Sequence, residues 1–152
     1  MQRVSQSIKE CIARAEFVSV APDDVVADAV AAMLNKNTDC VLVVEDEKLV
    51  GIFTERDFVQ RVTAEKLDVA STKMREVMTE KPQTLRSHDR VSYAINQMVV
   101  GGYRNVPIVD EHGRPTSVLD VRLVMTHLIK VFSELEQNPD SDDDEWIDIG
   151  GG

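Results

Sequence analysis

The segment GIFTERD at residues 51–57 returns in altered form as SVLDVRL at residues 117–123. Each version is a short, mainly apolar run that leads into Thr54 or Asp120, and both residue types are favoured at the N-terminal cap of a helix. The two segments therefore predict the same local structure twice, a strand that passes directly into a helix.

The similarity extends outward from these segments. A shift of 65 positions places residues 24–33 on residues 89–98, and residues 41–44 on residues 106–109. One inserted residue around Gly113 then raises the shift to 66. The chain thus contains one structural unit twice, and two copies predict a pseudo-symmetric pair whose units cover each other's apolar faces.

Each copy has the same predicted order of elements, β-α-β-β-α. Apolar residues recur at helical spacing in the first helix, which ends at Asn or Gly residues that tolerate a left-handed cap. Two β-branched strands joined by a polar turn follow, and then a second helix. The fold class is therefore α/β (α+β). In the first copy the five elements are expected, in order, at residues 17–20, 26–34, 41–44, 49–53 and from residue 54. In the second copy they are expected at residues 83–85, 91–99, 105–109, 116–119 and from residue 120.

We divide the chain into four regions. Residues 1–16 predict an amphipathic helix with Val4, Ile8, Cys11, Ile12 and Ala15 on one stripe. Residues 17–72 hold the first copy and a polar linker, and residues 73–132 hold the second copy. Residues 133–152 are acidic and are expected to be disordered, because no basic residue follows Lys130 and a self-repelling segment buries little.

Composition limits the classes of function. The 152 residues carry 17 Lys and Arg against 27 Asp and Glu, a net charge of -10, which argues against nucleic acid as a partner. No apolar run is long enough to span a membrane. Cys11 and Cys40 have no CxxC spacing, so we expect ordinary thiols in a reducing, cytoplasmic setting. No metal is expected: Asp140, Asp142 and Asp144 imitate the start of a calcium loop, but the required Gly and closing Glu are missing.

Three segments carry a resemblance to a known family: GIFTERD at 51–57, REVMTEKPQTL at 75–85 and YRNVPIVDEHG at 103–113. The repeat resembles the cystathionine-β-synthase (CBS) domain, and residues 15–130 resemble a freestanding tandem pair. The resemblance implies two repeats packed sheet to sheet in a regulatory module. It also implies an adenosine-containing ligand such as AMP, ADP, ATP, S-adenosylmethionine or an NAD-type molecule, although some members of the family bind nothing and serve only in dimerisation.

Thr54 and Asp57 have two compatible interpretations. Thr-x-x-Asp at a strand-to-helix junction is a capping box, in which each side chain bonds the other residue's backbone N–H. A carboxylate in this position can also accept hydrogen bonds from ribose hydroxyls. The family places its ribose and phosphate contacts on this motif, so the resemblance implies a nucleotide site here.

The resemblance also implies which residues complete this site, because the motif of one repeat faces strands of the other. Arg104 is expected to contact phosphate. For Arg56 two roles are equally expected, a contact with phosphate or a structural salt bridge. The predicted site consists of Thr54, Arg56, Asp57, Lys81, Gln83, Thr84, Arg104, Asn105 and Pro107.

The second copy predicts a degenerate site. Asp120 replaces the threonine and would repel phosphate, while Leu123 replaces the ribose-binding aspartate. Asp39 occupies the place that Arg104 holds in the other copy. We therefore expect one nucleotide per chain.

Catalysis has little support in the sequence, because His88, His112 and His127 have no clustering spacing and no Gly-rich phosphate loop occurs. We expect a non-enzymatic, ligand-sensing module that requires no cofactor and forms a homodimer.

Its predicted dimer surface consists of the N-terminal helix, Phe58, Val62, Leu123 and Leu128. The alternative is a ligand-free dimerisation or scaffold protein that contacts an unknown protein target through its acidic tail, with Trp146, Ile147 and Ile149 as the docking residues.

Overall fold

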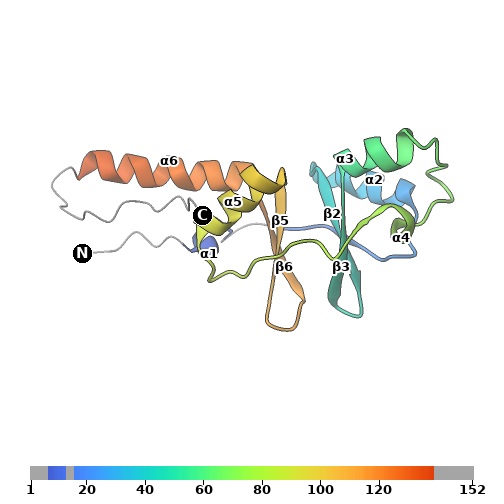
Figure 1. Cartoon of the computed structure of the whole chain (residues 1–152), viewed down its shortest axis with the longest axis horizontal. Helices are drawn as coiled ribbons and strands as arrows, with labels where there is room; N and C mark the ends of the chain where they lie inside the picture. The colour runs from blue at the N-terminus through green and yellow to red at the C-terminus, as the bar shows by residue number, and fades with distance from the viewer. Residues whose placement is uncertain (1–6, 13–15, 139–152) are drawn as a thin grey trace.

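The computed structural model describes residues 7–12 and 16–138. Two sheets lie side by side near the middle of the molecule, and helices flank them on the outer sides (Figure 1). One sheet has four strands in the order β1-β2-β3-β4, and the other has the two strands β5 and β6. The elements are α1 (Ile8–Cys11), β1 (Ser19–Val20), α2 (Val26–Lys36), β2 (Cys40–Glu45), β3 (Lys48–Thr54), α3 (Glu55–Asp57), the π-helix η1 (Phe58–Thr63), α4 (Met74–Val77), β4 (Thr79–Glu80), α5 (Val91–Gly101), β5 (Asn105–Val109), β6 (Pro115–Asp120) and α6 (Val121–Gln137).

The pseudo-symmetry predicted from the sequence is confirmed in the register of the strands. Cys40 pairs with Thr54 in the first repeat, and Asn105 pairs with Asp120 in the second. Both antiparallel pairs have an irregularity at the equivalent place, after Val43 and after Ile108. The two hairpins thus share one geometry, even though the second has the extra residue in its turn.

The strand predicted at residues 83–85 is reduced to a single bridge. Leu85 pairs in parallel with Ile108, the equivalent of the pairing between β1 and β2. The reason is that β4, a few residues earlier, pairs with β3 of the first sheet instead. The chain must cross from one sheet to the other over residues 81–84, where Lys81 has a positive φ of 45° and Pro82 lacks an N–H donor.

The short helix that leads into each repeat packs against the other repeat. Ile8 of α1 is buried in the core of the second repeat, together with Val91 and Leu119. Met74 of α4 is buried in the core of the first repeat, among Val26 and other apolar residues. Of the helix predicted at residues 1–16, the described part is helical only at Ile8–Cys11, and Val4 and Ala15 lie outside the described residues.

A third apolar cluster joins the two sheets. It consists of Cys40, Leu42 and Ile52 from the first sheet and Val118 from the second. Burial raises the pKa of the Cys40 thiol to about 12, so this cysteine stays protonated and acts as a small apolar residue. The sheet-to-sheet packing expected from the resemblance therefore rests on side chains of β2, β3 and β6.

The ends of the helices agree with the sequence signals. Asn37 and Gly102 end α2 and α5 in the left-handed conformation. Asp120 caps α6, with its carboxylate accepting from the N–H of Leu123 at 2.8 Å. α6 ends at Gln137, so the boundary predicted at residue 133 falls inside this helix, and the remainder of the acidic tail lies outside the described residues.

Gly51 marks a close approach between β3 and β4. A Cβ atom at this position would lie 2.5 Å from Sδ of Met78 and 3.2 Å from the carbonyl oxygen of Thr79. We expect Gly51→Ala to lower the free energy of unfolding by about 1–3 kcal/mol, because the side chain and the neighbouring backbone must shift. For a chain of this size the melting temperature should fall by about 2–4 °C for each kcal/mol, measurable by calorimetry.

Met78→Ala supplies the matched background for this experiment. It removes the Met78 side-chain atoms that the new Cβ would meet, but leaves the carbonyl of Thr79 in place. The additional loss caused by Gly51→Ala should therefore be smaller in Met78→Ala than in the natural chain. Equal losses in both backgrounds would contradict the proposed steric cause.

Candidate functional site

A cleft of about 640 Å³ lies between the two repeats at the point where β3 passes into α3. The first repeat contributes Thr54, Arg56 and Asp57, and the crossover and β5 of the second contribute the opposite wall. Eight of the nine predicted site residues line this cleft; Thr84 does not. The eight are Thr54, Arg56, Asp57, Lys81, Gln83, Arg104, Asn105 and Pro107.

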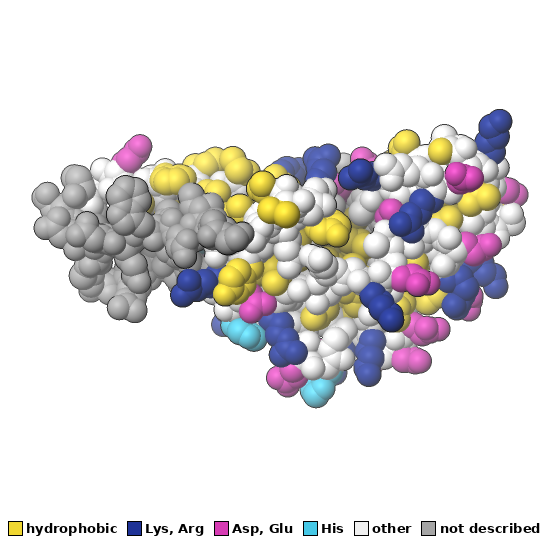
Figure 2. Space-filling view, viewed as in Figure 1, with side chains coloured by type: hydrophobic (Ala, Val, Ile, Leu, Met, Phe, Trp, Pro, Cys, Tyr) yellow, Lys and Arg dark blue, Asp and Glu magenta, His cyan; other side chains and the backbone are white. Residues whose placement is uncertain are grey.

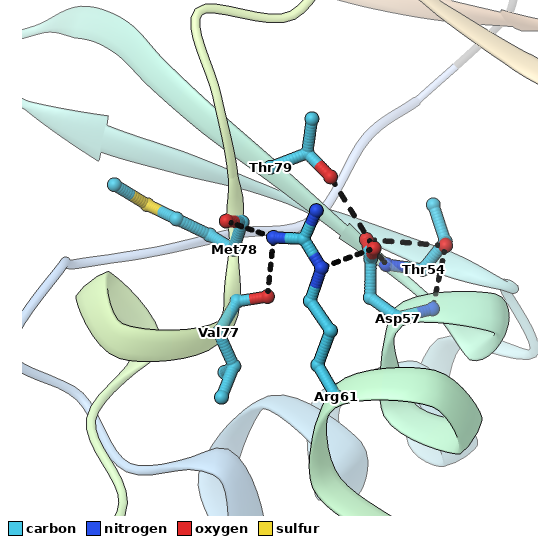
Figure 3. A network of polar contacts seen from close by, with 6 residues as sticks. All are labelled: Thr54, Asp57, Arg61, Val77, Met78 and Thr79. Atoms are coloured by element: carbon cyan, nitrogen blue, oxygen red, sulfur yellow. Dashed lines mark hydrogen bonds and ion pairs between the residues drawn. The ribbon is translucent and has the colours of Figure 1, made fainter. Parts of the chain in front are cut away.

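The capping box at the start of α3 is present in full (Figure 3). The N–H of Asp57 donates to Oγ1 of Thr54 at 3.3 Å, and the N–H of Thr54 donates to Oδ2 of Asp57 at 3.0 Å. The hydroxyl of Thr54 also donates to Oδ2, at 3.3 Å. Asp57 is only 8% exposed, so these bonds hold a buried carboxylate at the edge of the cleft.

The other carboxylate oxygen of Asp57 also has partners. The hydroxyl of Thr79 donates to Oδ1 at 3.2 Å, and Nε of Arg61 lies 3.6 Å from the same oxygen (Figure 3). A carboxylate has about four lone-pair positions, so these contacts use its accepting capacity. A ligand hydroxyl that bonds Asp57 must therefore replace one of the present donors.

Arg61 connects the carboxylate to the end of α4, just before β4. Its Nη1 donates to the carbonyl oxygen of Met78 at 2.8 Å and to that of Val77 at 3.4 Å (Figure 3). Arg61 belongs to the π-helix η1, whereas the equivalent segment of the second repeat is the regular helix α6. π-helical turns occur frequently at functional sites, so this difference between the copies coincides with the cleft.

Sequence reasoning missed Arg61 and Thr79. Arg61 lies beyond the motif of residues 51–57, and a π-helical turn has no clear signature in the sequence. Thr79 lies within the segment 75–85 that carries the resemblance, but its contact with Asp57 depends on the pairing of β4 with β3. Further lining residues that the sequence did not single out include Gln60, Glu80, Gln97 and Tyr103.

The cleft has a mixed electrostatic character. Its lining carries four cationic side chains and four carboxylates: Arg56, Arg61, Lys81 and Arg104 against Asp39, Glu55, Asp57 and Glu80. Arg56 forms no ion pair with any described residue, so the structural salt bridge considered for it is absent from that part of the chain. The apolar part of the cleft wall consists of Ile52, Pro82, Val106 and Pro107.

The equivalent place in the second repeat differs. A smaller cavity of about 300 Å³ lies there, and its lining includes Asp39, Glu55 and Asp120. Leu123, which takes the position of Asp57, packs against the core of the second repeat rather than lining this cavity. The second copy therefore has no carboxylate at the position equivalent to Asp57.

No group of His, Cys, Asp and Glu among residues 7–12 and 16–138 is arranged to hold a metal ion. None of the three histidines lines the large cleft. None of the described helices is both long enough and apolar enough to cross a membrane. The side chains that line the large cleft offer hydrogen bonding, ion pairing and apolar contact.

Comparison with known proteins agrees with this architecture. The CBS domain family model matches residues 8–64 and again residues 74–130. The chain therefore belongs to the CBS domain family, as a tandem pair. It is 32% identical over 112 residues to the CBS domain-containing protein CBSCBSPB1 of Arabidopsis thaliana, a stretch that covers 74% of this chain but only 20% of that relative.

Solved structures share the fold. The crystal structure of the CBS domain NE2398 has 28% sequence identity and a TM-score of 0.75, covering 81% of this chain and 97% of that one. The CBS domain protein PAE2072 from Pyrobaculum aerophilum, complexed with AMP, has 20% identity and a TM-score of 0.73, covering 84% of this chain and 98% of that one.

The contacts of Arg61 lead to a prediction about stability. Arg61→Met keeps the aliphatic stem but removes the ion pair with Asp57 and both bonds to the carbonyls of Val77 and Met78. We expect a loss of about 1 kcal/mol, discounted for the partial exposure of the side chain, and a melting temperature lower by about 2–4 °C in calorimetry.

Arg56→Met is the matched control, since Arg56 lies one helical turn earlier and makes no ion pair with a described residue. Its melting temperature without ligand should stay within about 1 °C of the natural chain. An equal effect of the two substitutions would show that loss of positive charge, rather than the Arg61 contacts, causes the change.

Proposed function

We propose that this protein is a non-enzymatic, ligand-sensing module that binds one adenosine nucleotide in the cleft between its repeats. The observation that carries the proposal is the meeting of Thr54 and Asp57 from one repeat with Arg104 and Asn105 from the other around a single cavity. The AMP complex of the Pyrobaculum aerophilum relative supports the choice of an adenosine ligand.

Each part of a nucleotide finds suitable chemistry in this cleft. Asp57 and Thr54 accept from the ribose hydroxyls, with the Thr79 hydroxyl rotating away from Oδ1 to make room. Arg104, Arg56 and Lys81 are the cationic side chains available to the phosphate. The base lies against the apolar wall that includes Val106 and Pro107, both of which are buried.

The charge of the cleft favours AMP as the first ligand to test. Its four cations are balanced by four carboxylates, and one pair, Arg61 with Asp57, is already formed. A triphosphate would bring more negative charge than the remaining cations offset, whereas a monophosphate requires fewer of them. ADP, ATP, S-adenosylmethionine and NAD-type molecules form the comparison panel.

Binding is expected to act on the crossover between the repeats. A ribose hydroxyl that takes the place of Thr79 on Oδ1 of Asp57 shares this oxygen with Arg61, so the contact with Arg61 weakens. Arg61 also holds the carbonyls of Val77 and Met78. These carbonyls immediately precede β4, whose pairing ties the crossover to the first sheet. Ligand occupancy is thereby coupled to the segment that sets how the repeats meet.

We expect AMP to raise the melting temperature by several degrees. Ligand at about 100 times its dissociation constant adds about 2.7 kcal/mol to stability, and each kcal/mol is worth about 2–4 °C.

Asp57→Asn should weaken AMP binding about tenfold to a hundredfold in titration calorimetry, with one site per chain in the natural protein.

Arg122→Ala is the matched control, because Arg122 takes the place of Arg56 in the second repeat and is 86% exposed. It should leave the affinity for AMP unchanged. Since Asp57 also belongs to a capping box, its variant must first show native circular dichroism. The proposal fails if no adenosine ligand binds at millimolar concentration, and the assignment to this cleft fails if two equivalent sites titrate.

We also propose that the protein forms a homodimer, through a surface different from the one expected. Val62 is buried in the first core, and Phe58, Leu123 and Leu128 pack against cores. These side chains face inward because each helix turns its most apolar stripe to its own repeat.

The exposed apolar residues of α6 instead form a second stripe, Met125, Ile129, Phe132 and Leu135. In Figure 2 hydrophobic side chains gather over α6 and the neighbouring α5.

A second copy of the chain offers the same stripe, so two copies related by a twofold axis can cover each other's α6. Ile129→Glu places a charge where Ile129 is now 62% exposed and should convert the dimer to a monomer in sedimentation velocity. Lys130→Glu introduces the same residue one position later and should leave the dimer intact. A monomeric natural chain would refute the proposed dimer.

The remaining expectations stay proposals. A cytoplasmic setting and a regulated protein target fit a ligand-sensing module, and the relatives belong to a family of CBS-domain proteins. The alternative scaffold function depends on Trp146, Ile147 and Ile149, which lie outside the described residues. Because the chain covers only 20% of its Arabidopsis relative, the function of that longer protein does not carry over.

A further inference from the structure

Gln97 brings a buried polar atom to the cleft. Its side-chain carbonyl oxygen Oε1 is buried and accepts no hydrogen bond from any described residue. The same residue lines the large cleft. A buried acceptor without a partner is unfavourable, so the position gains free energy from any molecule in the cleft that supplies a donor.

The position of Gln97 in α5 sets it apart from an ordinary surface glutamine. It lies one turn after the buried Ala94 and one turn before Gly101, which also lines the cleft. A Cβ atom at Gly101 would meet the ring of Tyr103, so Tyr103 packs directly over this glycine. Gln97 therefore lies on a face of α5 that is closely packed and shared with the cleft.

The pseudo-symmetry supplies an internal comparison. With the shift of 65 positions, Gln97 of the second repeat corresponds to Ala32 of the first. The same place in the fold thus accepts a residue with no polar side chain, and packing alone does not require an amide. The amide occurs only in the repeat whose α5 faces the Thr54 and Asp57 motif across the cleft.

We propose that Gln97 is a specificity-determining residue that accepts a hydrogen bond from the exocyclic amino group of an adenine base. This inference rests on the proposed function and adds which part of the ligand is recognised, and by what atom. The ribose hydroxyls are assigned to Asp57 and the phosphate carries no donor when ionised, so the amino group is the donor left for Oε1.

The test compares two ligands that differ only in this amino group: AMP and purine riboside 5′-monophosphate, which has hydrogen in its place. The natural chain should bind AMP about tenfold more tightly than the analogue in titration calorimetry. Gln97→Ala, which introduces the residue found at position 32, should bind the two ligands equally. Gln97→Glu keeps an acceptor at this position and should preserve the preference for AMP.

Asn96→Ala is the matched control, because Asn96 is an exposed amide on the same helix and does not line the cleft. It should retain the full preference for AMP. A preference that persists in Gln97→Ala, or that is absent from the natural chain while AMP still binds, overturns this inference and leaves the proposed function standing. Failure of the natural chain to bind AMP overturns both.

Discussion

The structure depends on the burial of two small sheets that neither repeat can cover alone. Each sheet has one face against its own helices and the other against its counterpart, where Leu42, Ile52 and Val118 meet. The exchange of leading helices adds a second constraint, since Ile8 completes the core of the second repeat and Met74 that of the first. Separating the repeats would expose all of these apolar side chains to water, which is why the pair is the unit of stability.

The cleft is a consequence of this arrangement. Because the sheets pack face to face, the end of β3 in one repeat lies opposite β5 of the other, and the chain crosses between them. The two copies keep the same backbone, down to the irregularities after Val43 and Ile108, yet differ in the side chains presented to the two equivalent places. A nearly symmetric scaffold therefore carries an asymmetric site, and a few substitutions, such as Leu123 at the position of Asp57, account for the difference.

Asp57 shows how closely stability and binding are linked here. The same carboxylate caps a helix, accepts from Thr79 and pairs with Arg61, so the unliganded protein already satisfies it. Binding through this group is an exchange of donors rather than the filling of an empty position. In the proposed function, such an exchange lowers the net affinity that one hydrogen bond contributes, but it couples the neighbouring contacts of the crossover to the ligand.

The sequence by itself determined the repeat, the order of elements and the helix caps at Thr54 and Asp120, because periodic burial and capping leave local patterns in the chain. Most of the cleft lining was implied by the resemblance to the CBS family, since residues that meet across two repeats leave no local pattern. Only the tertiary structure decided that residues 83–85 make a single bridge, that α1 and α4 exchange partners, and that Arg61 and Thr79 share Asp57. It also placed Leu123 and Leu128, both partly buried, against the core of the second repeat. These features arise from contacts between residues far apart in the chain, where the pairing of β4 with β3 and the packing of α6 compete with alternatives that local sequence leaves open.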